Sequence, residues 1–315
     1  MYIQTTDKYN KRQTIGRKRK FTGFIMKNFT YSELPKSYFK PAAKQGKVER
    51  INYPTKKYGV KYAYVYTPYG YDSTDMNTRY DILYLVHGAN SGTETFLWGE
   101  NMNSHFKNML DHMIENGEIA PLLVVTPTFY PPGSISAGQR RERELAEEFP
   151  DELIHHLMFS VESMYLTYAD SIDYDGFRAS RDHRLFGGFS MGGVITWYVF
   201  AGLMDCFRTY IPLSGDCWKL CRLGGERMPE ETAEWLADSV RNSSWTSDDF
   251  KIYTATGTLD TAYYALKNQI DAMLKHSDIF INSKNLLSFS AKGGVHDYVY
   301  AYEYLYSALC AIQRL

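Results

Sequence analysis

The chain has 315 residues, of which 44% are hydrophobic and 23% are charged, with a formal net charge of −1. This composition is ordinary for a globular protein, and four cysteines in a chain of this length do not make a disulfide scaffold. The near-neutral charge argues against a nucleic-acid partner. No apolar run reaches the roughly 18 residues of a membrane span, so an integral membrane protein is excluded and no membrane partner is expected.

Positive charge is concentrated at the start of the chain. Residues 1–50 carry 13 Lys and Arg against 3 Asp and Glu, and residues 17–20 are all basic. We interpret residues 1–45 as a solvated, disordered basic leader, with a nucleic-acid patch as the lesser alternative. The start has no apolar stretch like that of a secretory signal, so a cytoplasmic location stays open.

From about residue 46 onward, apolar patterns predict strands alternating with helices. Residues 47–53 and 61–67 alternate apolar and polar positions, which predicts an antiparallel pair at the edge of a sheet. Six further strands are expected at 80–86, 122–127, 183–189, 208–213, 250–256 and 286–290, and helices at 102–116, 143–167, 191–204, 229–241, 262–276 and 297–313. This alternation predicts one α/β domain, residues 46–315, with a mostly parallel central sheet and helices on both faces. Residues 216–249 are interpreted as an insertion near the site.

The strongest chemical signal is the run GFSMG at residues 188–192, followed by another glycine. It comes directly after a predicted strand and directly before a predicted helix, which is the setting of a nucleophile elbow. The flanking glycines permit the tight turn, and free amides at the start of the helix favour an anion there. The pattern therefore predicts Ser190 as a nucleophile. The alternative is a glycine-rich helix entry with a serine cap.

A serine nucleophile needs a base and an acid, and in this fold the acid and then the histidine follow the serine along the chain. Only His276 and His296 lie far enough downstream. His296 falls in a loop between the last predicted strand and helix, where α/β folds gather their sites, whereas His276 lies near a helix end. Asp260 closes a strand segment between nucleophile and base and is the predicted acid, with Asp216, one strand earlier, as the alternative.

An acyl-transfer site also needs two backbone donors for its oxyanion. One is predicted to be the amide of Met191, the residue after the nucleophile. The other is expected from the loop after strand 80–86, with Ala89 as the first choice and Asn90 as the second. His87 is then expected to orient this loop through hydrogen bonds.

The sequence shows no motif for a metal or an organic cofactor, so neither is expected. Cys217 and Cys221 are four residues apart, and we expect two free thiols there, with a disulfide as the alternative.

Several of these stretches together resemble a known family. They are residues 69–71, 83–88, 187–193, 212–218, 256–260 and 294–298. In this combination the sequence is similar to the feruloyl esterase and acetyl xylan esterase family, the first family of carbohydrate esterases. It resembles most the feruloyl esterase modules of bacterial xylanases, over about residues 45–315.

The resemblance implies an α/β-hydrolase fold that needs no cofactor and releases ferulic or another hydroxycinnamic acid from arabinoxylan side chains. It implies the same three residues, Ser190, Asp260 and His296, as the catalytic triad. The implied partners are a feruloylated xylo-oligosaccharide or another small ester and a neighbouring xylanase or carbohydrate-binding module, and the implied location is outside the cell. The residues expected to contact substrate are Trp218, as a wall of the acyl pocket, together with Trp98, Asp216, Asn90, Phe129 and Tyr130.

Two other functions stay open. One is another esterase or acyltransferase on the same scaffold, acting on acetyl xylan, siderophore esters, thioesters or mycolyl groups, and it would differ in pocket size and acceptor. The other is a non-catalytic carbohydrate-binding protein. The intact set of serine, aspartate and histidine argues against a pure binder, which has no use for an aligned triad.

Overall fold

The computed structural model describes residues 29–100 and 102–312. In these residues one eight-stranded sheet has the order β1-β2-β4-β3-β5-β6-β7-β8. The strands are β1 (Lys47–Thr55), β2 (Gly59–Thr67), β3 (Asp81–Val86), β4 (Leu122–Thr126), β5 (Arg184–Phe189), β6 (Thr209–Leu213), β7 (Lys251–Gly257) and β8 (Leu286–Ala291). β1 pairs antiparallel with β2, and β2 with β4, whereas the remaining pairs are parallel. The predicted antiparallel edge and parallel centre are confirmed.

Helices connect the strands and cover the sheet. They are α1 (Glu94–Leu97), α2 (His105–Glu115), α3 (Gln139–Glu152), α4 (Met158–Glu162), α5 (Tyr174–Ala179), α6 (Met191–Gly202), α7 (Gly224–Arg227), α8 (Pro229–Arg241), α9 (Tyr263–Met273) and α10 (Tyr298–Ala311). Two short 3-10 helices, η1 (Lys36–Phe39) and η3 (Arg181–His183), and a π-helical turn, η2 (Leu153–Leu157), complete the set. Across the described ranges, none of the helices combines the length and the apolarity that a membrane crossing needs.

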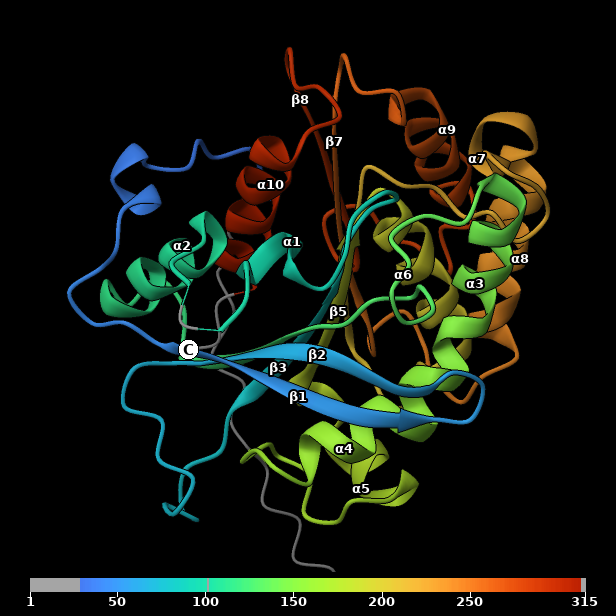
Figure 1. Ribbon diagram of the computed structural model, residues 1–315. Helices are drawn as coiled ribbons and strands as arrows, with labels where there is room; N and C mark the ends of the chain where they lie inside the picture. The colour runs from blue at the N-terminus through green and yellow to red at the C-terminus, as the bar shows by residue number, and fades with distance from the viewer. Residues whose placement is uncertain (1–28, 101, 313–315) are drawn as a thin grey trace, which may run out of the picture.

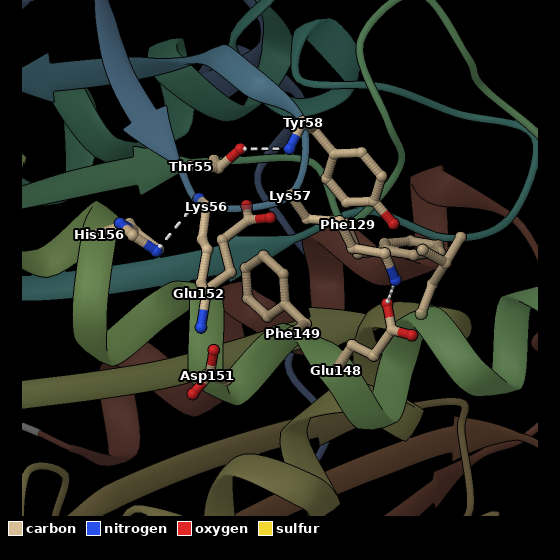
Figure 2. A pocket seen from close by; sticks show the side chains of 11 residues that line it. Thr55, Lys56, Lys57, Tyr58, Phe129, Glu148, Phe149, Asp151, Glu152 and His156 are labelled. Carbon is tan, nitrogen blue, oxygen red and sulfur yellow. Dashed lines mark hydrogen bonds and ion pairs between the residues drawn. The ribbon is translucent and has the colours of Figure 1, made fainter.

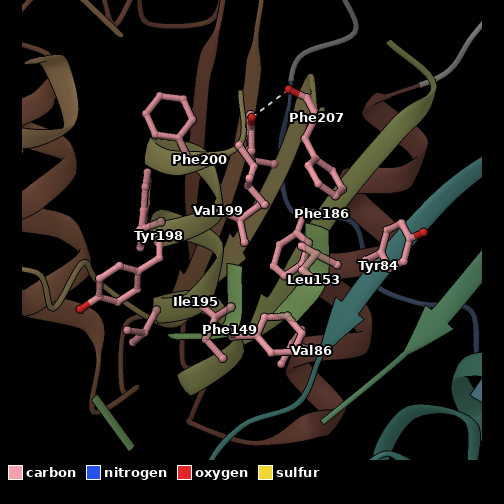
Figure 3. Close-up of a cluster of buried hydrophobic side chains, with 14 of the residues drawn as sticks. Tyr84, Val86, Phe149, Leu153, Phe186, Ile195, Tyr198, Val199, Phe200 and Phe207 are labelled. Carbon is pink, nitrogen blue, oxygen red and sulfur yellow. Dashed lines mark hydrogen bonds between the residues drawn. The ribbon is translucent and has the colours of Figure 1, made fainter. Parts of the chain in front are cut away.

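The sheet is buried on both faces because its parallel strands are apolar at nearly every position. In β3, Tyr84 and Val86 point into one core with Phe149 of α3 and Ile195 of α6 (Figure 3). Leu85 points into the other core, which α2 and α10 close. The two helical layers lie on opposite sides of the sheet (Figure 1). The α/β-hydrolase fold, with helices on both faces, is confirmed.

Two predicted segments differ in detail. The helix expected at 143–167 begins four residues earlier and is broken into α3, η2 and α4. Pro150 lies inside α3 and has no N–H to donate, so regular hydrogen bonding stops near it and a π-helical turn follows. The segment 216–249 was interpreted as an insertion. Part of it belongs to the core of the domain, because α8 buries Leu236 there.

The expected leader, residues 1–45, is partly wrong. Residues 29–45 pack against the domain, and Phe29, Leu34 and Tyr38 are buried in the core that α2 and α10 close. The backbone N–H of Ser32 donates to Ser307 Oγ of α10 at 3.0 Å. The folded domain therefore includes these residues. Residues 1–28, with the basic run, lie outside the described part of the chain.

Candidate active site

Ser190 occupies a sharp turn between β5 and α6. Its backbone has φ 58° and ψ −115°, a conformation that a residue with a side chain adopts only when its surroundings hold it there. Its N–H donates to Leu213 O at 2.9 Å. Two residues on, a Cβ at Gly192 would lie 2.0 Å from Val86 O, so only glycine lets α6 approach β3 this closely. The glycines of the motif thus serve the turn and the packing below it.

The three residues predicted as nucleophile, base and acid lie in one hydrogen-bonded row. His296 Nε2 is 2.8 Å from Ser190 Oγ, and His296 Nδ1 is 2.7 Å from Asp260 Oδ1. The Asp260 side chain is fully buried and also accepts from the N–H of Ala262 at 2.7 Å. Because a carboxylate can only accept, Nδ1 carries the proton and Nε2 is free to accept from the serine hydroxyl.

The alternative acid and base lie elsewhere. Asp216 is buried, and its carboxylate accepts from Trp218 Nε1 and from the N–H of Gly225, each at 2.9 Å. His276 follows α9, where its ring lies 3.6 Å from Glu234 Oε2. Neither is hydrogen-bonded to Ser190 or His296. The geometry therefore favours Asp260 and His296 over both alternatives.

The loop after β3, which carries the predicted second donor, approaches the serine at Gly88. A Cβ on Gly88 would lie 3.1 Å from Ser190 Cβ. The ring of His87 is buried, with Nδ1 2.7 Å from Gly88 O and Nε2 2.8 Å from Thr128 Oγ1. Burial lowers the pKa of His87 to about 4, so near pH 7 the ring is neutral and joins two partners, as the sequence predicted for a loop-orienting residue. Met191 begins α6, where an amide has no acceptor within the helix.

The predicted substrate contacts divide into two groups. Asn90 and Trp98 have exposed side chains, and Trp218 keeps 8% of its surface accessible. Contact with a substrate stays a prediction for these three residues. Asp216 lacks the surface that such a contact requires, because it is 1% exposed and both its oxygens already accept hydrogen bonds. Its observed role is to hold the indole of Trp218.

Phe129 and Tyr130 are buried rather than open to a substrate at the triad. Both rings stack on His87, with centroids 5.1 and 5.8 Å away. Phe129 also faces a cavity of about 560 Å³ between the β1–β2 turn and α3, which none of the triad residues lines (Figure 2). Their burial does not support the expectation that these two side chains contact substrate: both rings pack on His87 instead.

The remaining predictions for residues 29–100 and 102–312 concern the cysteines and the groups of metal-ligating side chains. All four cysteines are free thiols, so the alternative of a disulfide between Cys217 and Cys221 is wrong. In the parts of the chain with described positions, no group of three or more His, Cys, Asp or Glu is arranged to hold a metal ion.

One residue of the site received no role from its sequence position. Tyr298, at the start of α10, accepts the N–H of Gly88 on its hydroxyl at 2.8 Å. The two residues are 210 positions apart, so no spacing along the chain points to the contact. The only local signal is an aromatic residue two places after His296.

Known proteins similar to this chain include esterases, in agreement with the geometry of the site. No family model matches the chain. It is 37% identical over 289 residues to endo-1,4-beta-xylanase Y of Acetivibrio thermocellus, which covers 89% of this chain and 24% of that protein. It is 29% identical over 198 residues to an endo-1,4-beta-xylanase/feruloyl esterase of Xylanibacter ruminicola, covering 59% of this chain and 23% of that protein. The chain thus spans about a quarter of the length of these curated relatives.

Solved structures cover the chain more completely. The feruloyl esterase module from Clostridium thermocellum, complexed with sinapinate, is 35% identical, covers 93% of this chain and 99% of its own, and has a TM-score of 0.78. An S-formylglutathione hydrolase of Staphylococcus aureus, 17% identical with a TM-score of 0.57, shares the fold alone. The fold, the site geometry and these relatives define a carboxylic ester hydrolase of the α/β-hydrolase class. Within that class the chain belongs to the feruloyl esterase family, the first family of carbohydrate esterases, as the resemblance implied.

Proposed function

We propose that this protein hydrolyses esters of hydroxycinnamic acids, ferulic acid foremost, on the side chains of arabinoxylan, with Ser190 as the nucleophile. The observation that carries the proposal is the row of hydrogen bonds from Ser190 Oγ through His296 to the buried Asp260. The choice of substrate is supported by the feruloyl esterase and xylanase relatives.

In the proposed first step, His296 Nε2 takes the proton of the Ser190 hydroxyl as Oγ attacks the ester carbonyl. Asp260 holds the Nδ1–H and stabilises the imidazolium that forms. The imidazolium then gives its proton to the departing sugar oxygen, which leaves an acyl group on the serine. Water enters, His296 removes its proton, and the carboxylic acid is released with the serine restored.

The negative oxygen of each tetrahedral intermediate is proposed to lie between the amides of Met191 and Ala89. Both belong to backbone that is held before substrate arrives, the first by α6 and the second by the loop after β3. A donor of this kind contributes about 3 kcal/mol to transition-state stabilisation. We further propose that Trp218 and Trp98 contact the aryl group, because both are aromatic and retain accessible surface.

The relatives also support a setting for the reaction. Each curated relative is about four times as long as the matched region and has a xylanase activity in its name. We propose that the esterase acts beside xylan-cleaving or carbohydrate-binding modules, at the cell exterior where plant cell-wall polysaccharide is found.

The test is hydrolysis of methyl ferulate and of 4-nitrophenyl acetate by the wild type and by Ser190→Ala. We expect the wild type to cleave methyl ferulate, and the variant to lose about 10⁴-fold or more in kcat/KM on both esters. A matching thermal unfolding midpoint shows that the variant is folded. Cleavage of the acetate alone contradicts the hydroxycinnamate substrate, and full activity in Ser190→Ala contradicts the nucleophile.

A further inference from the structure

We propose that Tyr298 is a positioning residue for the oxyanion hole: its hydroxyl holds the Gly88 amide and thereby aims the neighbouring Ala89 N–H at the reacting carbonyl. The contact is a 2.8 Å hydrogen bond from Gly88 N–H to the tyrosine oxygen. The inference rests on the proposed serine mechanism, and it concerns the step at which negative charge develops rather than the choice of acyl group.

Gly88 is a point of conformational freedom in the loop, since glycine restricts φ and ψ less than other residues do. A larger residue would be crowded here, because a Cβ would meet Ser190 Cβ at 3.1 Å and the Tyr298 oxygen at 3.2 Å, and these neighbours would have to move by a few tenths of an ångström. The residue that allows the loop to approach the nucleophile therefore also leaves the loop free to turn. Contacts from side chains therefore have to define the conformation of the loop at Gly88.

Two side chains do so, one on each peptide plane beside Gly88. Tyr298 binds the N–H of the peptide before it, and His87 Nδ1 donates to the carbonyl of the peptide after it at 2.7 Å. A peptide unit is planar and trans, so its N–H points opposite to its carbonyl. With Gly88 O directed at His87, the N–H of Ala89 points away from His87. Both torsions of the glycine are then determined by side-chain contacts.

Tyr298 is well placed to act as a rigid support. Its ring packs against Phe189 and Phe96, with centroids 5.0 and 5.6 Å away, and its hydroxyl donates to Ser91 Oγ at 3.1 Å. It lies two residues after His296, whose own ring packs on Phe189 at 4.7 Å. One short segment thus positions both the base and an oxyanion donor relative to the serine.

The test compares Tyr298→Phe, which removes only the hydroxyl, with Tyr302→Phe on the same helix. Tyr302 is the control because it is a tyrosine one turn further along α10 whose ring is buried and packs on Phe106. With 4-nitrophenyl acetate we expect kcat of Tyr298→Phe to fall about 10- to 100-fold while KM stays within about 3-fold. The Ki of phenylboronic acid, whose tetrahedral adduct with the serine resembles the intermediate, should rise by a similar factor. Tyr302→Phe should change none of the three.

Several outcomes would overturn the inference: an unchanged boronate Ki, a loss expressed in KM alone, or an equal loss in Tyr302→Phe. If Tyr298→Phe does not fold, Ser91→Ala, which removes the acceptor of the tyrosine proton, takes its place. We then expect a smaller loss in kcat, about 3- to 10-fold, and an unchanged kcat contradicts the inference.

The assay separates this inference from the proposed substrate. Methyl ferulate is measured in parallel, and if the wild type cleaves only 4-nitrophenyl acetate, the hydroxycinnamate substrate fails while the contrast between the two tyrosine variants still decides the role of Tyr298. If neither ester is cleaved, the proposed function fails, and the boronate affinities of the two variants decide the inference.

Discussion

At the scale of single residues, two buried aspartates, Asp260 and Asp216, differ in role because their hydrogen-bond partners differ. Asp260 and Asp216 both follow strands and both are buried. Asp260 accepts from the imidazole of His296, whereas Asp216 accepts from the Trp218 indole and the Gly225 amide. The first therefore belongs to the proposed proton relay, and the second holds the indole of Trp218.

Asp216 should make stability depend on pH in an unusual direction. Burial raises its pKa from 3.8 to about 6, against the lowering effect of its two donors, so the folded protein binds this proton more tightly than the unfolded chain. Its contribution to stability is complete below about pH 4 and is lost as pH rises through about 6, by about 3 kcal/mol in all. Asp216→Asn has no such proton. We expect the unfolding free energy of the wild type minus that of the variant to fall by most of this amount, about 2 kcal/mol, between pH 4 and 7.

Urea unfolding of both proteins at several pH values measures that difference, and titrations shared by the two proteins cancel in it. Parallel curves across the range would show that Asp216 keeps an ordinary pKa in the folded protein.

At the scale of elements, the site depends on how closely α6 packs behind the ends of β3 and β5. Gly192 is in the first turn of α6, directly under the end of β3, and Gly202 ends the same helix in open space. The same residue type therefore has different roles at the two ends of one helix. Gly192 lets the helix approach β3 closely, whereas no neighbouring atom requires a glycine at position 202.

Substituting alanine at each position tests this. A Cβ at Gly192 would lie 2.0 Å from Val86 O, a backbone atom that cannot move without the strand. We expect Gly192→Ala to cost about 3 kcal/mol of unfolding free energy and most esterase activity. Gly202→Ala, the matched control, should be neutral or stabilising by up to about 1 kcal/mol. Denaturant unfolding and the acetate assay on both variants measure this, and equal effects would rule out the packing argument.

At the scale of the whole molecule, two cores on opposite faces of the sheet hold the strand ends in place, and the second core is completed by the segment that precedes β1. Residues 29–45 lie against α2 and α10, and α10 starts two residues after His296. A segment expected to be a solvated leader thus supports the helix that follows His296, the proposed base.

Leu34→Ala tests whether this segment is part of the fold. The side chain is 2% exposed, and its removal should cost about 2–4 kcal/mol of unfolding free energy. Glu33→Ala, an exposed change one residue earlier, should stay within about 0.5 kcal/mol. Thermal or urea unfolding distinguishes the two variants. An unchanged unfolding free energy in Leu34→Ala would show that this segment does not contribute to the stability of the fold.

Much of the fold could be predicted, and so could the hydrogen-bonded row of Ser190, His296 and Asp260, because both depend on short-range patterns. Apolar runs of strand length alternating with helical periods indicate a parallel sheet. The elbow is a local motif, and the order of the acid and the base after it is a property of the fold class. The short helices α1 and α7 were not predicted, since four residues do not show a helical period.

The sequence by itself determined the α/β class, the edge pair, Ser190 and its two partners, because these follow from local periodicity and chain order. Only the tertiary structure decided that Phe129 is buried against His87, that residues 29–45 pack on the domain, and that the Tyr298 hydroxyl accepts from Gly88. The physical reason is that each of these depends on side chains brought together from distant parts of the chain. Packing and burial select such contacts, and no pattern along the sequence specifies them.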